Sequence, residues 1–350
     1  MLDTFCEVYD LLKPYADAEF WDFQQHINNG KLIPGAIYLI GRQQFNNNVE
    51  RIKQLAETNT ILPFLSNPTE GSSTMIGHCQ QIGILDLIRQ EKILLITGGF
   101  IPDEYPSIYY ENFLPKVLDY DENISAIQIY NEAPLVNRPY KFLFLNGCGR
   151  RHRRQLLGRL KNLLGQSLWT NLDSSAGPIH LLPPEYEYKE FTNYTNIPTE
   201  GFIKQQLMPD IPWPEIYIKA DPYIDTYFSL VTETVFEYPY TFRTEKIWKP
   251  IAIGHPWIAV ANYGFYRDMH NLGFQTFGHL IDESFDLIED NHSRLERIAQ
   301  VVEDLCRHDL DQFIKECYNI CKYNQQYLSE MRIKVRQEFP DRFFKFLNRV

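Results

Sequence analysis

A threonine, a glutamate and a lysine follow one another directly before a short apolar segment that is predicted to be a helix. Thr244 is a good N-cap, Gly254 stands where the helix would end, and Pro250 inside it predicts a bend or an early stop. A helix start offers free amide groups and a partial positive charge, and Lys246 adds a full charge. Phosphate is a ligand that such a helix start binds, while Glu245 can accept hydrogen bonds from sugar or ribose hydroxyls. The alternative is an ordinary capped surface helix.

A second cluster of charge lies in FLFLNGCGRRHRRQLLGRL, residues 142–160. A predicted strand is followed by Asn146, a glycine-containing turn and a helix that opens with arginines, among them Arg150 and Arg153. Its leucines share one helical face and leave the arginines on the other. Because basic residues are unfavourable at the positive end of a helix dipole, a negative group is expected to compensate them. This is a second candidate anion site, and the alternative is a solvated basic face paired with acidic neighbours.

Both candidate sites lie where a predicted parallel strand ends and a helix begins, which is where open α/β sheets bind ligands. Two cationic groups that meet at one diphosphate would stabilise a departing nucleoside diphosphate as a metal ion does elsewhere. The arginine-rich segment contains neither GxxxxGK nor GxGxxG, which disfavours an ATPase and a simple dinucleotide-binding protein. The residues therefore favour a diphosphate site that works without a metal ion.

The elements that must position these residues alternate between short apolar strands and helices, which is typical of an α/β protein with largely parallel sheets. We expect two Rossmann-like domains, residues 1–135 and 136–291, followed by C-terminal helices, 292–350. Predicted strands lie at 36–40, 60–66, 92–99, 126–131, 141–147, 167–173, 225–234, 256–260 and 274–278. Predicted helices lie at 49–57, 80–90, 151–164 and 264–272. Residues 102–122 are predicted to form a loop, and residues 174–224 an irregular insertion.

Composition restricts the possible classes of protein. The chain has 350 residues with a net charge of -11, so a general nucleic-acid-binding protein, which must neutralise phosphates, is not expected. The six cysteines lack the paired spacing of a zinc site and are predicted to be free thiols. No uncharged run approaches the ~20 residues that span a bilayer, and no signal peptide opens the chain. We therefore expect a cytoplasmic protein in a reducing compartment.

Residues 227–266, YFSLVTETVFEYPYTFRTEKIWKPIAIGHPWIAVANYGFY, resemble the donor-binding segment of the α1,3/4-fucosyltransferases. In that family a strand ending in Glu is followed by a Thr-Glu-Lys helix start, a Gly and an apolar strand with Pro. Residues 142–160 are similar to the family's strand, Asn, Arg and leucine-patterned helix. The likeness covers roughly residues 140–275. Where the family has Glu-Asn-Ser, this chain has Glu233, Thr234 and Val235.

The resemblance implies a GT-B glycosyltransferase with two Rossmann-like domains and a nucleotide-sugar bound in the C-terminal one. It also implies that the C-terminal helices, 292–350, pack across both domains. It makes Arg153 and Lys246 ligands of the diphosphate and Glu245 a contact of the ribose or sugar. The donor-binding residues that it implies are Asn146, Arg150, Arg153, Glu233, Thr244, Glu245 and Lys246. A GDP-sugar is the favoured donor, the acceptor is an unknown glycan or protein, and no separate cofactor or metal is required.

Transfer of a sugar to a hydroxyl also needs a general base, usually a carboxylate of the N-terminal domain. The candidates are Glu70, Asp103 and Glu104, all of which follow predicted strands; each could equally be an ordinary loop acid. We favour the loop at 97–105 because its two glycines permit a ligand to approach the backbone closely.

Two other functions stay open. One is a metal-dependent transferase, in which an Asp-x-Asp motif after a strand holds a divalent ion. Asp119 and Asp121, in VLDYD, have this spacing. The other is a non-catalytic module that binds a nucleotide or sugar phosphate, since a fold can be kept without its activity.

Overall fold

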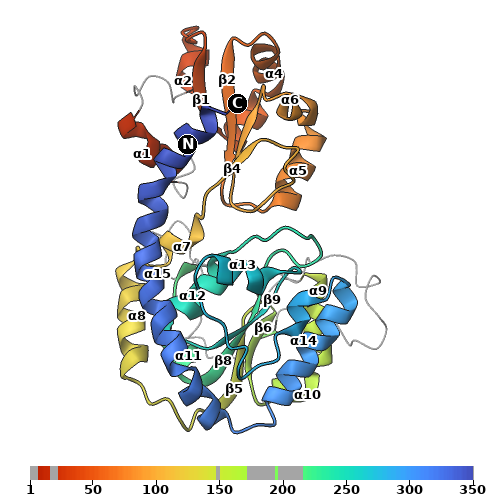
Figure 1. Ribbon diagram of the computed structural model, residues 1–350, viewed down its shortest axis with the longest axis vertical. Helices are drawn as coiled ribbons and strands as arrows, with labels where there is room; N and C mark the ends of the chain where they lie inside the picture. Colours follow the sequence, from red (N-terminus) through yellow and green to blue (C-terminus); the bar gives the residue numbers. More distant parts are fainter. Residues whose placement is uncertain (1–6, 16–22, 147–149, 172–193, 196–215, 350) are drawn as a thin grey trace. The chain divides into compact units, whose positions relative to one another are not determined.

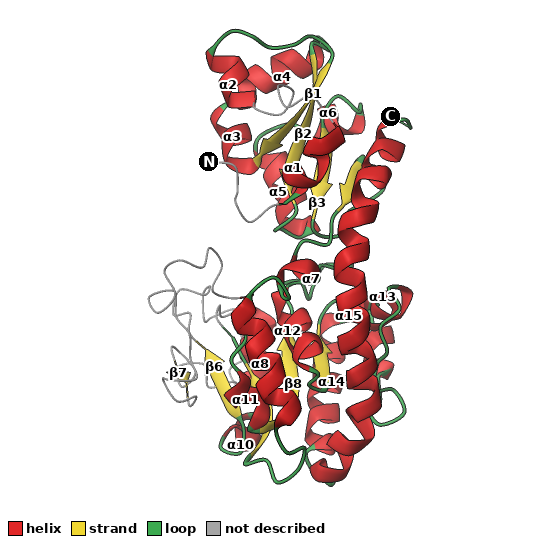
Figure 2. Cartoon of the chain, turned by 90° about the vertical axis from the view of Figure 1, so that its left-hand side faces the viewer, coloured by secondary structure: helices red, strands yellow, loops and turns green. Residues whose placement is uncertain are grey.

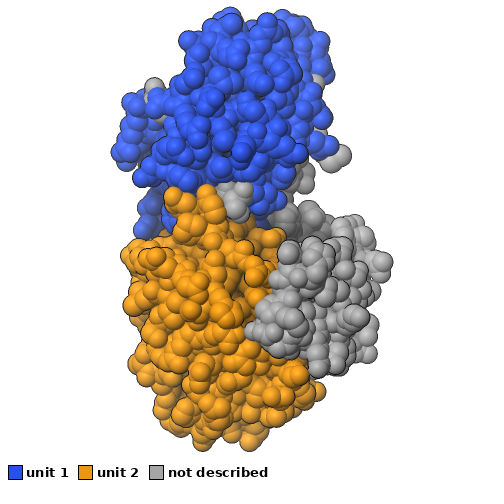
Figure 3. All heavy atoms as spheres, turned by 90° about the vertical axis from the view of Figure 1, so that its right-hand side faces the viewer, with its two compact units in different colours: residues 1–115, 331–350 blue, residues 116–330 orange. Residues whose placement is uncertain are grey.

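The computed structural model describes residues 7–15, 23–146, 150–171, 194–195 and 216–349. The chain divides into two compact units, unit 1 with residues 1–115 and 331–350, and unit 2 with residues 116–330, which Figure 3 shows in two colours. We expected the first domain to end near residue 135. In the structure residues 116–135 belong to unit 2, because the helix at Asp121–Glu132 packs on other helices of that unit.

Unit 1 is built on a sheet of four parallel strands in the order β1-β2-β3-β4 (Figure 1). The strands are β1 (Ala36–Gly41), β2 (Ile61–Asn67), β3 (Leu94–Thr97) and β4 (Ser107–Tyr109). The helices are α1 (Val8–Leu12), the 3-10 helix η1 (Lys13–Tyr15), α2 (Phe23–Asn28), α3 (Arg42–Asn47), α4 (Val49–Glu57), α5 (Ser72–Gln81) and α6 (Leu85–Arg89). Helix α7 (Phe113–Lys116) lies at the boundary between the units.

The two faces of this sheet bury different partners, as the alternation of side chains along a strand requires. Leu65 and Leu95 belong to the buried cluster that also contains Ile52 of α4 and Ile88 of α6. Phe64, next to Leu65 along β2, instead contacts Phe343 and Phe346 near the C-terminus, with ring centroids 5.1 and 6.3 Å apart. The core of unit 1 thus includes residues from both ends of the sequence.

Unit 2 is built on a second parallel sheet, β6-β5-β8-β9, with the short strand β7 antiparallel at its edge. The strands are β5 (Tyr140–Phe144), β6 (Leu168–Asn171), β7 (Tyr194–Thr195), β8 (Thr226–Thr232) and β9 (Trp257–Val260). The helices are α8 (Asp121–Glu132), α9 (Arg151–Arg159), α10 (Lys161–Leu164), α11 (Ala220–Ile224), α12 (Glu245–Ile253), α13 (Phe265–Asn271), the 3-10 helix η8 (Ser284–Leu287), α14 (Asn291–Leu305) and α15 (Leu310–Leu347). Helices α8 and α11 lie side by side in both ribbon views (Figures 1 and 2).

The predicted α/β architecture, with two Rossmann-like halves and a long C-terminal helix, is confirmed. Helix α15 has 38 residues, of which those up to Glu330 belong to unit 2 and the rest to unit 1. In unit 2 its Asp311 accepts a hydrogen bond from the Tyr227 hydroxyl of β8 at 2.6 Å. Among the described residues, no helix combines the length and apolarity needed to span a membrane.

Two predicted strands are wrong. Residues 126–131 lie in α8, whose buried Asn123, Ala126 and Tyr130 follow the helical and not the strand period. Residues 274–278 form no strand, because Phe274 and Phe277 pack on two tryptophans, with ring centroids 5.3 and 5.7 Å away. The loop predicted at 102–122 contains β4 and α7 and the start of α8. The predicted insertion at 174–224 falls largely outside the described residues.

The turn that follows α13 is held by one carboxylate. Glu283 accepts a hydrogen bond from the Phe277 backbone amide at 2.8 Å and another from the Thr276 hydroxyl at 2.7 Å. His270 in turn lies with its Nε2 atom 2.8 Å from that hydroxyl. Burial raises the pKa of Glu283 from 4.5 to about 7, and the nearby charges of Asp286 and Asp282 act in the same direction.

Candidate functional site

The start of α12 forms as the sequence predicts. Thr244 is the N-cap, and its hydroxyl accepts a hydrogen bond from the Lys246 amide at 3.4 Å. At the other end Gly254 adopts the left-handed conformation with φ 81°, and the amide of His255 donates to the Pro250 carbonyl at 2.8 Å. The helix does not stop early at Pro250, contrary to one expectation, because the proline removes only one backbone donor and the helix continues to Ile253.

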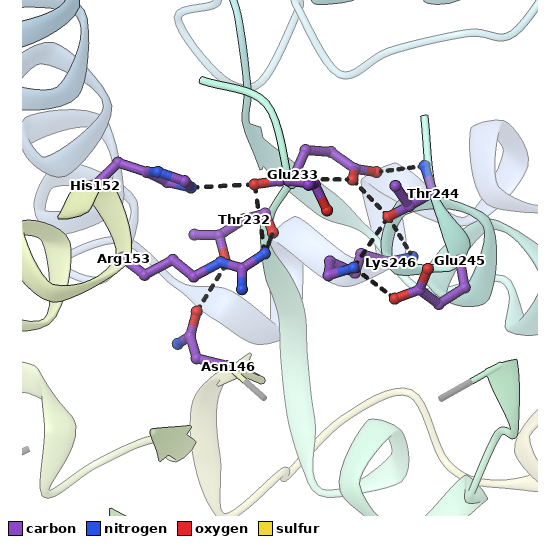
Figure 4. Close-up of polar contacts among 9 residues, drawn as sticks. Asn146, His152, Arg153, Thr232, Glu233, Thr244, Glu245 and Lys246 are labelled. Carbon is purple, nitrogen blue, oxygen red and sulfur yellow. Dashed lines mark hydrogen bonds and ion pairs between the residues drawn. The ribbon is translucent and has the colours of Figure 1, made fainter. Parts of the chain in front are cut away.

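Glu233, directly after β8, holds the N-terminus of this helix (Figure 4). Its side chain is fully buried, and its two carboxylate oxygens accept hydrogen bonds from the Thr244 amide at 3.1 Å and the Thr244 hydroxyl at 2.6 Å. The Thr234 amide donates to the same carboxylate at 3.2 Å. Burial raises the pKa of Glu233 above its ordinary value, although the charge of Lys246 acts in the opposite direction. Glu233 is therefore a support of the helix start.

Glu245 and Lys246 form an ion pair in the first turn of α12. The Lys246 ammonium donates to Glu245 Oε1 at 2.5 Å and to the Thr244 hydroxyl at 3.2 Å. Burial favours the neutral form of Glu245, but the ammonium groups of Lys246 and Lys249 outweigh it and lower the pKa of this carboxyl. The Lys246 side chain keeps 26% of its surface exposed, against 7% for Glu245, so the cation is the more accessible partner.

Arg153 reaches the same strand end from α9. Its guanidinium donates to the backbone carbonyls of Thr232 at 3.0 Å and Glu233 at 3.4 Å. His152 Nε2 donates to the same Glu233 carbonyl at 3.1 Å, and its ring stacks on Phe236 with centroids 5.0 Å apart. Burial, together with the charge of Arg153, holds the pKa of His152 well below its ordinary value, so this imidazole is neutral.

Asn146 follows β5 and connects the ends of three strands. Its backbone N–H donates to the Thr170 hydroxyl of β6 at 2.8 Å, and its side-chain Oδ1 accepts from the Thr232 hydroxyl of β8 at 2.8 Å. The side chain is fully buried, and its Nδ2 has no hydrogen-bond partner within the described residues. Arg150 is the N-cap residue of α9 and is exposed. The glycine turn between them, 147–149, lies outside the described residues.

The leucine pattern predicts that the arginines of α9 share one solvated face. This prediction is wrong for two of them. Arg153 is 2% exposed and Arg154 is 6% exposed, because α9 is covered on more than its leucine side. Arg151 does face solvent, where its guanidinium lies 3.8 Å from the Glu237 carboxylate.

The loop between Glu233 and α12 is fixed by a buried arginine of α14. Arg294 is 1% exposed and donates to the Phe236 carbonyl at 2.6 Å, the Ala261 carbonyl at 3.2 Å and the Ile288 carbonyl at 2.9 Å. The loop is therefore tied at Phe236 to the end of β9 and to α14.

Six of the seven predicted donor-site residues thus belong to one network at the carboxyl ends of β5 and β8: Asn146, Arg153, Glu233, Thr244, Glu245 and Lys246. Arg153 bonds the carbonyl of Glu233, and Lys246 reaches its carboxylate through Thr244. Two cations therefore approach one residue from different helices, an arrangement suited to an anion. Sequence reasoning missed His152 and Thr232. Only the position of His152 in the arginine run signalled it.

The predicted general-base candidates all lie in unit 1. Glu70 follows β2 and lies 3.8 Å from the Arg42 guanidinium, with 35% of its side chain exposed. Glu104 lies in the connection from β3 to β4, 3.6 Å from Arg89, with 56% of its side chain exposed. Its neighbour Asp103 is also exposed.

The aspartate pair proposed for a metal ion does not follow a strand. Asp119 comes after α7, and Asp121 is the first residue of α8, where a carboxylate favours the positive end of the helix dipole. Across the part of the chain that the structure describes, no three or more His, Cys, Asp or Glu side chains are grouped so as to hold a metal ion. The four cysteines described, Cys79, Cys306, Cys317 and Cys321, are free thiols.

Comparison with known proteins adds no relative: no family model, no curated protein and no solved structure matches this chain.

Proposed function

We propose that the protein is a glycosyltransferase that moves a sugar from a nucleoside-diphosphate sugar to a hydroxyl acceptor, like the α1,3/4-fucosyltransferases that it resembles. A GDP-sugar is the favoured donor. The observation that carries the proposal is the approach of Arg153 and Lys246 to Glu233, one through the backbone carbonyl and the other through Thr244.

The chemistry explains why two fixed cations would be useful. The acceptor oxygen attacks the anomeric carbon, its proton passes to a base, and the bond from that carbon to the diphosphate breaks. The nucleoside diphosphate leaves with the electron pair and gains negative charge. Cationic donors that are already in place stabilise this charge without reorganising at the moment of reaction. No metal ion is needed for this step.

The residues of the network would divide the work. Lys246 has three donors and a partly exposed side chain, so its ammonium can bond a phosphate oxygen while it stays near Glu245. Glu245, ionised through its lysine neighbours, would accept hydrogen bonds from ribose or sugar hydroxyls. Asn146 Nδ2 is a buried donor that a ligand oxygen would satisfy. Glu233 would position Thr244 and would not touch the donor, because its carboxylate is already engaged.

Nucleotide binding tests the donor site directly. Thermal unfolding is measured with GDP, UDP, CDP and ADP in the presence of EDTA, since a ligand at 100 times its Kd stabilises the folded state by about 2.7 kcal/mol. We expect GDP to raise the unfolding temperature most. The shift should be lost in Lys246→Ala and reduced in Arg153→Lys. It should persist in Arg307→Ala, which removes an equal charge from a side chain that is 67% exposed. An unchanged shift in Lys246→Ala would refute the site.

Turnover separates the proposal from its two alternatives. Nucleotide release from GDP-sugars is measured with EDTA and with Mn²⁺. Release in EDTA supports the metal-independent transferase. Strict dependence on Mn²⁺, lost in Asp119→Asn and Asp121→Asn, would replace it by the metal-dependent one. Tight nucleotide binding without any turnover would replace it by a binding module.

A further inference from the structure

The row of strand ends that forms the candidate site continues to β9. In the order β5-β8-β9, Thr232 of β8 is the register partner of Val260 of β9, and the Glu233 amide donates to the Val260 carbonyl at 3.0 Å. Arg153 bonds the end of β8 from one side, and Lys246 lies on the other side (Figure 4). Since α9 follows β5 and α12 leads into β9, the network runs across the sheet from β5 toward β9. The residues that follow Val260 therefore extend the same edge.

Hydrogen bonds join these residues to the loop that enters α12. Thr241 lies three residues before the N-cap Thr244. Its hydroxyl donates to the Asp268 carboxylate of α13 and accepts from Asn262 Nδ2 at 3.1 Å. The same Nδ2 donates to the Tyr263 carbonyl at 2.8 Å. Tyr263 and α13 are thus tied to the chain directly before the start of α12.

Arg267 of α13 is positioned by its neighbours and keeps its guanidinium donors available. The residue is exposed, and its Cζ atom lies 5.7 Å from the ring centroid of Tyr263. Gly264, the N-cap residue of α13, has φ 76°, and a Cβ atom there would lie 2.5 Å from Arg267 Nη2. The Arg267 backbone amide bonds Asp286 at 3.2 Å, but within the described residues the guanidinium has no hydrogen-bond acceptor and no ion pair. A ligand can therefore reach its N–H groups from solvent.

A guanidinium edge distinguishes guanine from the other nucleobases. Two N–H groups of a guanidinium lie in one plane and match two acceptors that stand side by side. Guanine offers such a pair, O6 and N7, whereas adenine carries an amino donor in place of O6. Uracil and cytosine have a single ring and no N7 atom. A guanidinium that faces the base therefore favours a guanine nucleotide.

The order of the polar groups along the sheet edge fits a nucleoside diphosphate. Neighbouring strands lie about 4.8 Å apart, so the end of β9 is about 5 Å from that of β8 and about 10 Å from that of β5. The proposed function places the diphosphate at Arg153 and Lys246 and the ribose at Glu245. The base follows the ribose in the nucleotide, as β9 follows β8 in the sheet. Arg267 is an exposed cation at that end of the row.

We infer that Arg267 determines the base specificity of the nucleotide site by donating to O6 and N7 of guanine, with Tyr263 as the ring that supports its guanidinium. This inference rests on the proposed function and deepens it. The preference for a GDP-sugar comes there from the family resemblance, whereas Arg267 gives it a physical cause. Arg267 is thus a specificity-determining residue and not a catalytic one.

Calorimetric titration with four nucleotides in EDTA tests this contact. Inosine diphosphate keeps O6 and N7, 7-deaza-GDP lacks N7, and ADP lacks O6. We expect inosine diphosphate to bind the wild-type protein within about threefold of GDP, because it offers the same two acceptors. The affinity of 7-deaza-GDP should be about fivefold lower than that of GDP, and that of ADP about tenfold lower or more.

Variants separate recognition of the base from attraction by charge. Arg267→Ala should weaken GDP binding about tenfold and should not weaken ADP binding. Arg267→Lys keeps the charge but not the paired donors, so it should also lose most of the preference for GDP over ADP. Tyr263→Leu should lower this preference, and Tyr263→Phe should keep it. Arg307→Ala, which removes the charge of a side chain that is 67% exposed in the same unit, should change neither affinity.

The possible failures are distinguishable. Equal weakening of GDP and ADP in Arg267→Ala would assign the guanidinium to a phosphate and overturn the inference, as would an unchanged GDP affinity or equal binding of GDP and 7-deaza-GDP. In these cases the nucleotide site itself remains. If no nucleoside diphosphate binds the wild-type protein, the proposed function falls together with this inference. Unfolding temperatures show whether each variant keeps its fold, and Arg267→Lys decides the matter if another variant is unstable.

Discussion

The clearest quantitative prediction concerns Glu283, which holds the turn after α13 through the Phe277 amide and the Thr276 hydroxyl. Burial raises its pKa from 4.5 to about 7, so between these values the folded protein keeps a proton that the unfolded chain releases. The free energy of unfolding must therefore fall as pH rises through this window. It should be constant above it, where both states are ionised.

The size of this effect follows from the same shift. One pKa unit corresponds to about 1.4 kcal/mol, so the loss of stability between pH 4.5 and 8 is about 3 kcal/mol. Glu283→Gln mimics the protonated side chain, since its carbonyl can accept from Phe277 and its amide can donate to the Thr276 oxygen. We expect the unfolding free energy of the variant, relative to the wild type, to increase by that amount across the window.

Denaturation by guanidinium chloride at constant ionic strength and pH 4.5 to 8 measures the difference. The other titratable groups are the same in both proteins, so most of their contribution cancels. Asp282→Asn is the matched control. Hydrogen bonds from Ser284 and Arg297 lower the pKa of Asp282 to about 2, so this variant should show a nearly flat difference over the same range, with only the small slope that comes from removing a charge near Glu283. A flat difference for Glu283→Gln as well would refute the reasoning.

Three further predictions concern the supports of the candidate site, each measured by the midpoint of chemical unfolding. Thr244→Ala should cost about 1 kcal/mol because the helix loses its N-cap, whereas Thr244→Ser should cost little; equal losses would contradict the capping role. Gly254→Ala should cost about 1–2 kcal/mol because φ is 81° there, while Gly165→Ala, at φ -65°, should be neutral; similar effects would show that the left-handed conformation is unimportant. Arg294→Ala should cost more than about 3 kcal/mol because it leaves buried carbonyls unpaired, and Arg297→Ala, at a partly exposed side chain, less than about 1 kcal/mol.

The sequence predicted the fold where local pattern and tertiary structure agree. The strand and helix around Thr244 form as expected, because capping by Thr244 and termination at Gly254 are local effects. The strand predicted at residues 126–131 is wrong because alternating apolar residues in a short segment fit a strand as well as a helix. Only packing against α11 and α12 decides between the two.

The candidate site was predictable by residue type and less so by role. The positions of Arg153 and Lys246 at strand ends indicated an anion site. The engagement of Glu233 with Thr244, and the burial of Arg153 against two carbonyls, depend on long-range contacts that no spacing reveals.

Unit 1 is built from two segments that lie far apart in the sequence, residues 1–115 and 331–350. During synthesis its first 115 residues leave the ribosome long before Phe343 and Phe346, the rings that pack on Phe64. Until residues 331–350 emerge, Phe64 on one face of that sheet lacks the rings of Phe343 and Phe346, whereas unit 2 is continuous in sequence and ends at residue 330. Unit 2 can therefore complete its fold during synthesis before unit 1 does. Removal of residues 331–350 should leave Phe64 uncovered and accessible to chaperones.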